Sequence, residues 1–168
     1  MPAPATTLSP FSDPNASATA WDETRRALED AELFWISTVR TDGRPHVTPV
    51  VAVWAEGGMW FCTGAGEQKV VNMRANPHVV LTTGCNQWKN GLDVVAEGQV
   101  TQVTDDLVLA RVAEAFTAKW DGRWKWTARD GAFRDSGSDA EAIVFCVTPV
   151  KVFAHSKGDP FGETRHEF

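Results

Sequence analysis

The stretch Phe34-Trp-Ile-Ser-Thr-Val-Arg-Thr-Asp-Gly-Arg-Pro-His-Val-Thr-Pro-Val-Val51 decides the fold of this chain. Residues 34–40 form a β-type run, and residues 46–54 form a second one. The Asp42-Gly43 pair lies between them, and this dipeptide signals a β-hairpin because it accepts the left-handed conformations that tight turns require. The stretch therefore predicts two antiparallel strands joined by a short turn.

Further β-type runs follow this hairpin. Apolar patterning predicts strands over residues 59–63, 78–83, 92–103 and 141–152, and Pro149 indicates an edge or a bulge in the last one. Helical spacing predicts helices over residues 19–33, 67–76 and 106–120, the last capped by Thr104 or Asp105. Six strands connected mostly as meanders favour a mainly β fold, a small antiparallel barrel with a few flanking short helices.

Length and charge limit the class of protein. A chain of 168 residues is typical of one globular domain with a sizeable core. Residues 1–18 are rich in Pro, Ala, Ser and Thr, so we expect a flexible leader there and a domain over residues 19–168. The net charge of −6 argues against nucleic acid or an anionic membrane as a partner. No apolar run approaches the ~20 residues of a membrane span, and no signal peptide is recognisable.

The cysteines indicate the compartment. Cys62, Cys85 and Cys146 are an odd number without CxxC spacing, which favours free thiols in a reducing environment. We therefore expect a cytoplasmic protein.

A glycine-rich turn precedes the expected second helix. Gly64-Ala-Gly66-Glu-Gln-Lys69 matches neither GxGxxG nor GxxxxGK[ST], but it places Lys69 in the first helical turn, where the helix dipole disfavours a cation. Glycines before a helix expose backbone N–H groups, and a lysine there can neutralise a phosphate. From the residues alone, Lys69 is either an ordinary surface lysine or part of an anion site.

Other chemistries find little support in the sequence. The four histidines, His46, His78, His155 and His166, lack HxxxH and HExxH spacing, so no metal site is expected. No GxSxG motif is present, and no catalytic constellation stands out. The segment Trp120-Asp-Gly-Arg-Trp124-Lys-Trp126 serves either in packing or in covering a flat ligand.

Several segments, in order, resemble the pyridoxamine 5′-phosphate oxidase-like split-barrel superfamily, in particular its flavin- and deazaflavin-dependent branch. They are the opening stretch continued to Pro77-His-Val-Val-Leu81, then Gly91-Leu-Asp-Val-Val-Ala-Glu-Gly98, and Lys157-Gly-Asp-Pro-Phe-Gly-Glu-Thr-Arg165-His-Glu-Phe168. The resemblance implies a six-stranded antiparallel split β-barrel that forms a homodimer with cofactor sites at the subunit interface. The cofactor would be FMN or coenzyme F-420.

The resemblance also implies site residues. The backbone of Thr48, Pro49, Val50 and Val51 would lie along the isoalloxazine ring. Thr63, Gln68 and Lys69 would hold the cofactor phosphate together with backbone N–H groups around Gly66. Trp88 and Lys89 would come from the partner subunit. Residues 154–168 would form a tail that closes over the site, with contacts from Phe153, Lys157 and Arg165.

The expected activity is hydride transfer from the reduced cofactor to a small, planar, unsaturated substrate. The cofactor carries out that chemistry, so no catalytic side chain is required, and Trp124 and Trp126 would line the substrate site. The tail lacks the arginine-rich end of true pyridoxamine phosphate oxidases, which argues against vitamin B6 oxidation. The alternatives are a non-catalytic FMN-binding module and a haem- or tetrapyrrole-binding relative.

Overall fold

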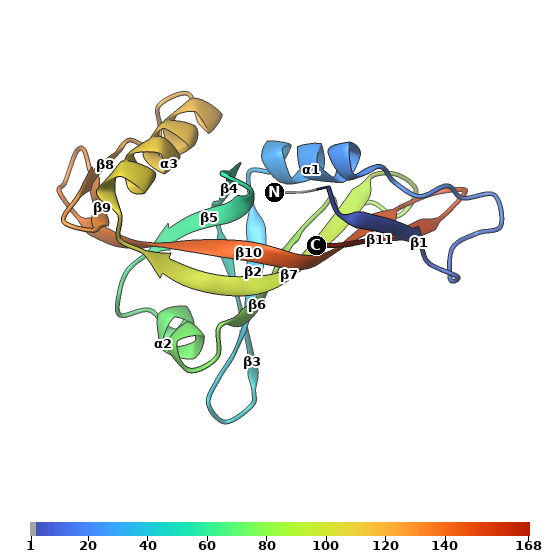
Figure 1. The fold of residues 1–168 in the computed structure, drawn as a ribbon, viewed down its shortest axis with the longest axis horizontal. Helices are drawn as coiled ribbons and strands as arrows, with labels where there is room; N and C mark the ends of the chain where they lie inside the picture. Colours follow the sequence, from blue (N-terminus) through green and yellow to red (C-terminus); the bar gives the residue numbers. More distant parts are fainter. Residues whose placement is uncertain (1–2) are drawn as a thin grey trace.

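A computed structural model describes residues 3–168, which form eleven strands and three helices (Figure 1). The strands are β1 (Ala5–Leu8), β2 (Phe34–Val39), β3 (Pro45–Val50), β4 (Val53–Ala55), β5 (Gly58–Thr63), β6 (His78–Thr83), β7 (Leu92–Val103), β8 (Trp126–Arg129), β9 (Ala132–Asp135), β10 (Glu141–Ser156) and β11 (Gly162–Glu167). The helices are α1 (Trp21–Asp30), α2 (Gln68–Ala75) and α3 (Asp106–Lys119).

The prediction of a mainly β, antiparallel, barrel-like fold is confirmed. The strands run in the order β1-β11-β10-β7-β6-β2-β3, and β4, β5, β8 and β9 attach to this path through β5 and β9, which both pair with β10. The number of strands is larger than the six expected from the sequence. The additional strands are stabilised by pairing more than by any pattern of their own: β4 pairs with β5, β8 with β9, β9 and β11 with β10, and β1 with β11.

The long strand β10 divides the sheet, because it changes partner midway. β7 pairs along one of its edges, while β5 pairs with the first half of the other edge and β11 with the second half. The register shifts between Pro149 and Lys151, at the change of partner. Proline has no N–H to donate to the ladder, so a bulge is expected there. The predicted bulge at Pro149 is confirmed.

Two apolar clusters form the core. The larger lies inside the barrel, is covered by α1, and includes Leu28, Phe34 and Ile36, all fully buried. The smaller lies between α3 and the β4, β5 and β10 strands and includes Phe116 and Phe133. Asp105 caps α3, since its carboxylate accepts hydrogen bonds from the N–H groups of Leu107 and Val108. No helix within residues 3–168 has the length and apolar character needed to cross a membrane.

The prediction of a flexible leader over residues 1–18 is wrong for part of that segment. Residues 5–8 form β1, which pairs antiparallel with β11, and Thr6 bonds the buried His166 through its hydroxyl. Low apolar content did not prevent order, because the partner strand satisfies the backbone and His166 engages the hydroxyl. Residues 1–2 of that leader lie outside the described residues.

The C-terminal segment is part of the sheet. β11 pairs with β10 on one side and with β1 on the other, and its Thr164 and His166 side chains are fully buried. The tail is therefore a structural strand, and only its outward side chains are free to contact a ligand.

Candidate functional site

The turn between β5 and α2 forms a small cradle of polar groups, which we call the β5–α2 cradle (Thr63, Gly64, Gly66, Glu67, Gln68 and Lys69). Glu67 is its centre: one carboxylate oxygen accepts from the Thr63 hydroxyl at 2.6 Å and from the Gly64 N–H at 3.3 Å. The other oxygen pairs with the Lys69 ammonium. These contacts lower the pKa of Glu67 below its ordinary value, and the hydrogen bond from Lys69 is the largest cause.

Lys69 is not a surface lysine. Its side chain is 6% exposed, although it lies in the first turn of α2 as predicted. A buried cation needs a partner, and in this structure Glu67 is that partner. The sequence did not indicate this pairing, although a glutamate two residues before the lysine was the available signal.

The cradle retains capacity to bind an anion. Glu67 is the N-cap residue of α2, but its carboxylate turns back toward Thr63 and does not cap the helix. Within residues 3–168, the backbone N–H groups of Gly66 and Gln68 donate no hydrogen bond. The space beside Gly66 is open, since a Cβ there would meet no atom within 4 Å. Free N–H groups at a helix start, a hydroxyl and a buried ammonium fit a phosphate group.

A chain of polar side chains holds α2 in place. The Gln68 side-chain amide donates to Asn72 at 2.8 Å, and Asn72 donates to the Thr38 hydroxyl of β2 at 2.9 Å. Asn72 is 1% exposed and its bond to Thr38 is shielded from water, whereas its bond with the exposed Gln68 is partly buried. Gln68 thus acts as a support for the helix in this structure, in addition to any contact it makes with a ligand.

The expected ring-contacting residues lie on and just after β3, at the edge of the sheet. Val50 is buried, Thr48 and Val51 are partly buried, and Pro49 is exposed. The Thr48 hydroxyl oxygen is buried without a hydrogen-bond partner in the described part of the chain. A buried polar atom without a partner is costly, so this hydroxyl marks a position where a bound group would gain a hydrogen bond.

Lys119, which the sequence did not single out, supports the same edge from α3. Its ammonium donates to the Ala52 carbonyl at 3.0 Å, directly after Val51, and to the Ala31 carbonyl at 2.5 Å. Burial lowers the pKa of Lys119 to about 8. Lys119 therefore fixes the segment between β3 and β4.

Phe153 and Arg165 lie opposite one another on β10 and β11. Because paired residues of antiparallel strands point to the same side, the register continues this row across the sheet to β3. Its members, which we call the outer row, are Pro49, Trp35, Thr82, Val95, Phe153, Arg165 and Thr7. The row faces away from the barrel core, and Trp35 is 50% exposed on it.

Lys157 bonds the loop that carries Trp88 and Lys89, at the end of the sheet near β11. The Lys157 ammonium donates to the Cys85 carbonyl and, at 2.8 Å, to the Asp93 carboxylate. The hydrogen bond to the Asp93 carboxylate is the main reason why the pKa of Lys157 is raised. Lys157 thus fastens the loop that carries Trp88, which is 87% exposed.

One chain does not bring all the expected cofactor contacts together. Thr63 pairs with Ile143 near the start of β10, whereas Arg165 pairs with Phe153, ten residues further along that strand. Ten residues correspond to roughly 30 Å of extended strand. Figure 1 shows α2 and β11 at opposite ends of β10.

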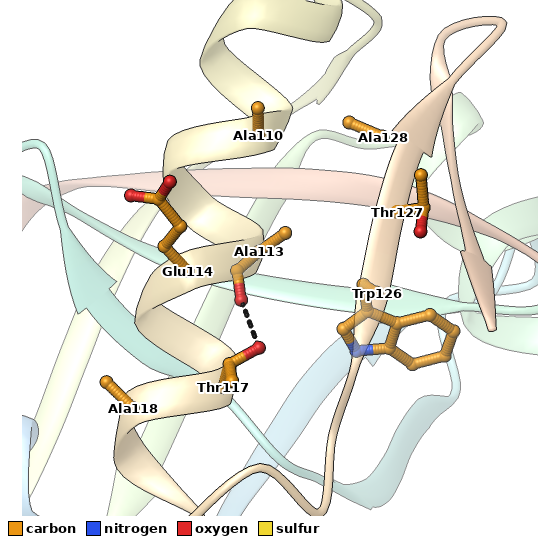
Figure 2. A pocket seen from close by; sticks show the side chains of 8 residues that line it. All are labelled: Ala110, Ala113, Glu114, Thr117, Ala118, Trp126, Thr127 and Ala128. Atoms are coloured by element: carbon orange, nitrogen blue, oxygen red, sulfur yellow. Dashed lines mark hydrogen bonds between the residues drawn. The ribbon is translucent and has the colours of Figure 1, made fainter. Parts of the chain in front are cut away.

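Trp124 and Trp126 lie beside α3. Their rings stack with centroids 6.0 Å apart, and Trp126 also stacks on Phe133 at 5.6 Å. Figure 2 shows Trp126 on β8 across from Ala113 and Thr117 of α3, where it lines a cavity of about 510 Å³. Its indole N–H is buried and has no partner within residues 3–168. Both tryptophans therefore contribute to packing, and Trp126 also lines the cavity.

The comparisons with known proteins agree with this fold. A family model described as pyridoxamine 5′-phosphate oxidase matches residues 20–156. Among solved structures, a conserved hypothetical protein from Mycobacterium tuberculosis has a TM-score of 0.66 at 18% identity, covering 81% of this chain and 84% of that one. An FAD-binding protein from Mesorhizobium loti has a TM-score of 0.60 at 16% identity, covering 98% of both chains. A chain described as an F-420 reductase has a TM-score of 0.55 at 22% identity, covering 76% of this chain and 94% of that one. At these identities the solved structures establish the fold alone.

Proposed function

The chain belongs to the pyridoxamine 5′-phosphate oxidase family, and from this membership we propose that it is an oxidoreductase that binds a flavin-type cofactor, either FMN or coenzyme F-420. The cofactor supplies hydride transfer when bound, and the chain positions it and excludes water. The proposed substrate is a small, planar, unsaturated compound.

The β5–α2 cradle carries this proposal. Lys69, the Thr63 hydroxyl and the N–H groups of Gly66 and Gln68 would hold the cofactor phosphate at this helix N-terminus. The two N–H groups donate no hydrogen bond within residues 3–168, and the space beside Gly66 is open. Thr63 and Lys69 would become available when the Glu67 carboxylate turns outward. Thr48 supports the same proposal from β3, since its buried hydroxyl has no partner among the described residues. Lys119 would keep the β3 edge at a fixed distance from the ring by holding the Ala52 carbonyl.

A homodimer completes the proposed site. The cradle and the pair formed by Phe153 and Arg165 lie ten residues of β10 apart, roughly 30 Å of extended strand. A second copy of the chain would bring its Phe153, Lys157, Arg165, Trp88 and Lys89 to the first copy's cradle. The outer row offers a surface for that copy, because it exposes Trp35, and Val39 of the same strand and Val47 of β3 are also exposed.

Trp124 and Trp126 are proposed to border the substrate site. The cavity beside Trp126 has a flat aromatic wall and one buried N–H donor, which suits a planar compound with a hydrogen-bond acceptor. Free cysteines at 62, 85 and 146 are in keeping with a reducing cytoplasm as the proposed compartment.

The test is the absorption spectrum of the protein purified from a host that makes both cofactors, followed by titration with each. A bound flavin or deazaflavin that is reoxidised when planar unsaturated compounds are added would support the proposal. A bound FMN that no substrate reoxidises would favour a non-catalytic FMN-binding module. A haem spectrum would favour the tetrapyrrole alternative, against which His166 stands, because both of its ring nitrogens are hydrogen-bonded to threonines. A protein that binds none of these groups would contradict the proposed function.

A further inference from the structure

Glu67 occupies the space in the β5–α2 cradle that the proposed function gives to a phosphate group. Its carboxylate accepts from Thr63, from the Gly64 N–H and from Lys69. These are donors of the kind that would otherwise contact a bound anion. The Glu67 side chain is 51% exposed, so it is free to move toward solvent when an anion enters.

We propose that Glu67 acts as an internal anion that selects the charge of the bound phosphate group, favouring a singly charged phosphodiester over a doubly charged phosphomonoester. This inference rests on the proposed function, since it concerns the cofactor that the cradle would hold. Coenzyme F-420 carries a phosphodiester, whereas FMN carries a phosphomonoester.

The argument starts from the net charge of the cradle. Lys69 contributes one positive charge and Glu67 one negative charge, so the pair is neutral. A monoester carries a charge of about −1.5 to −2 at neutral pH. Once Glu67 turns away, Lys69 can pair with one phosphate charge. Any further negative charge of the phosphate group meets no cation from this pair and is repelled by the carboxylate.

Glu67 remains close even when it is displaced. It is the N-cap residue of α2, so its backbone is fixed at the edge of the cradle, and only the side chain can turn outward. Because the side chain is short, its carboxylate stays close to a phosphate group bound in the cradle. The separation remains within roughly 10 Å, the distance over which charges interact in 0.1 M salt. The repulsion therefore persists in the bound state and grows with the charge of the phosphate group.

Substitution of Glu67 by glutamine makes this selection measurable. Glu67→Gln keeps the size of the side chain but leaves the cradle with one net positive charge. We expect it to tighten FMN binding about tenfold, which corresponds to about 1.4 kcal/mol, and F-420 binding by only about threefold. Riboflavin has the same ring as FMN but no phosphate, so its affinity should not change. Fluorescence titration with these three compounds gives all the dissociation constants.

Two further variants control the experiment. Glu23→Gln removes the same charge from an exposed position in the first turn of α1, away from the cradle, and should change none of the three affinities. Glu67→Ser removes the charge and provides a favoured N-cap residue, so it serves if glutamine impairs folding. It should shift the FMN to F-420 preference in the same direction.

The outcomes distinguish this inference from the proposed function. Equal changes for FMN and F-420, no change, or weaker FMN binding in both Glu67 variants would overturn the selection by Glu67. If no ring compound binds any of the proteins, the proposed function fails, and inorganic phosphate becomes the probe. Phosphate should then raise the melting temperature of both Glu67 variants more than that of the wild type. An equal effect on all three proteins would overturn the inference independently.

Discussion

Thr24 of α1 and His166 of β11 are joined by a buried hydrogen bond, with 2.9 Å between the hydroxyl oxygen and Nε2. The other ring nitrogen of His166 lies 2.9 Å from the Thr6 hydroxyl of β1. One fully buried imidazole thus connects β11 to β1 and α1, which lie more than a hundred residues earlier in the chain. The C-terminal strand therefore belongs to the folded core.

Removal of this imidazole should destabilise the protein. His166→Ala deletes one buried and one partly buried hydrogen bond and leaves two threonine hydroxyls without the imidazole, so we expect the free energy of unfolding to fall by about 2–4 kcal/mol. Unfolding in denaturant measures this change in the free energy of unfolding. Arg165→Ala, on the exposed side of the same strand, is the control and should stay within about 0.5 kcal/mol of the wild type. Equal stability of the His166 variant and the wild type would show that β11 only rests on the sheet.

The same histidine makes stability depend on pH. Burial lowers the pKa of His166 below its ordinary value of 6.5. Between the folded pKa and 6.5 the unfolded chain binds a proton that the folded chain does not, so stability falls as pH decreases through this window. Above 6.5 this contribution is constant. We expect the melting temperature of the wild type to fall more steeply toward acid pH across this range than that of His166→Gln. Parallel profiles would show that His166 is not the source of the pH dependence.

Lys69 should matter for phosphate binding and for stability. Lys69→Ala removes a charge-assisted hydrogen bond of about 1.5–3 kcal/mol, so FMN binding should weaken roughly 10- to 150-fold. Because the lysine stem is buried, we also expect a stability loss, which Lys69→Met should largely avoid by retaining apolar contacts. Titration with FMN and riboflavin separates the effects, since riboflavin lacks the phosphate. Unchanged FMN affinity in both variants would remove Lys69 from the cofactor site.

The outer row should be the surface on which two chains meet. Trp35→Glu places a charge on this row, and we expect it to convert a dimer into a monomer and to weaken cofactor binding at least tenfold, since half of the proposed site is lost. Light scattering measures the mass. Leu107→Glu, at another exposed apolar position, is the control and should leave the mass unchanged. A wild-type monomer that binds cofactor tightly would contradict the interface.

Trp126 should affect substrate recognition through its unpaired N–H. Trp126→Phe retains an aromatic ring against Phe133 but removes the donor, so it should raise KM about tenfold for planar substrates that carry a carbonyl or nitro acceptor. Substrates without an acceptor provide the control, and kcat should change little. If KM is the same for both kinds of substrate, the cavity beside α3 is a packing feature.

Local patterns predicted much of the fold. The hairpin at Asp42-Gly43, the strand β7 and the helix α3 follow from alternation, turn chemistry and capping, and these depend on residues within a few positions of one another. The matched segments also identified the family correctly. The cofactor-binding residues taken from that family remain predictions.

Only the tertiary structure decided which residues are buried and paired. Nothing near Thr6 in the sequence indicates a strand, because its partner β11 lies about 160 residues away. Lys69 and Glu67 have the composition of a solvated turn, and only the packing of α2 against the barrel makes the lysine a buried cation that requires a carboxylate. The sequence by itself determined the strands and turns through short-range patterns. The ion pair in the cradle and the distance between Thr63 and Arg165 depend on long-range packing, which no local pattern contains.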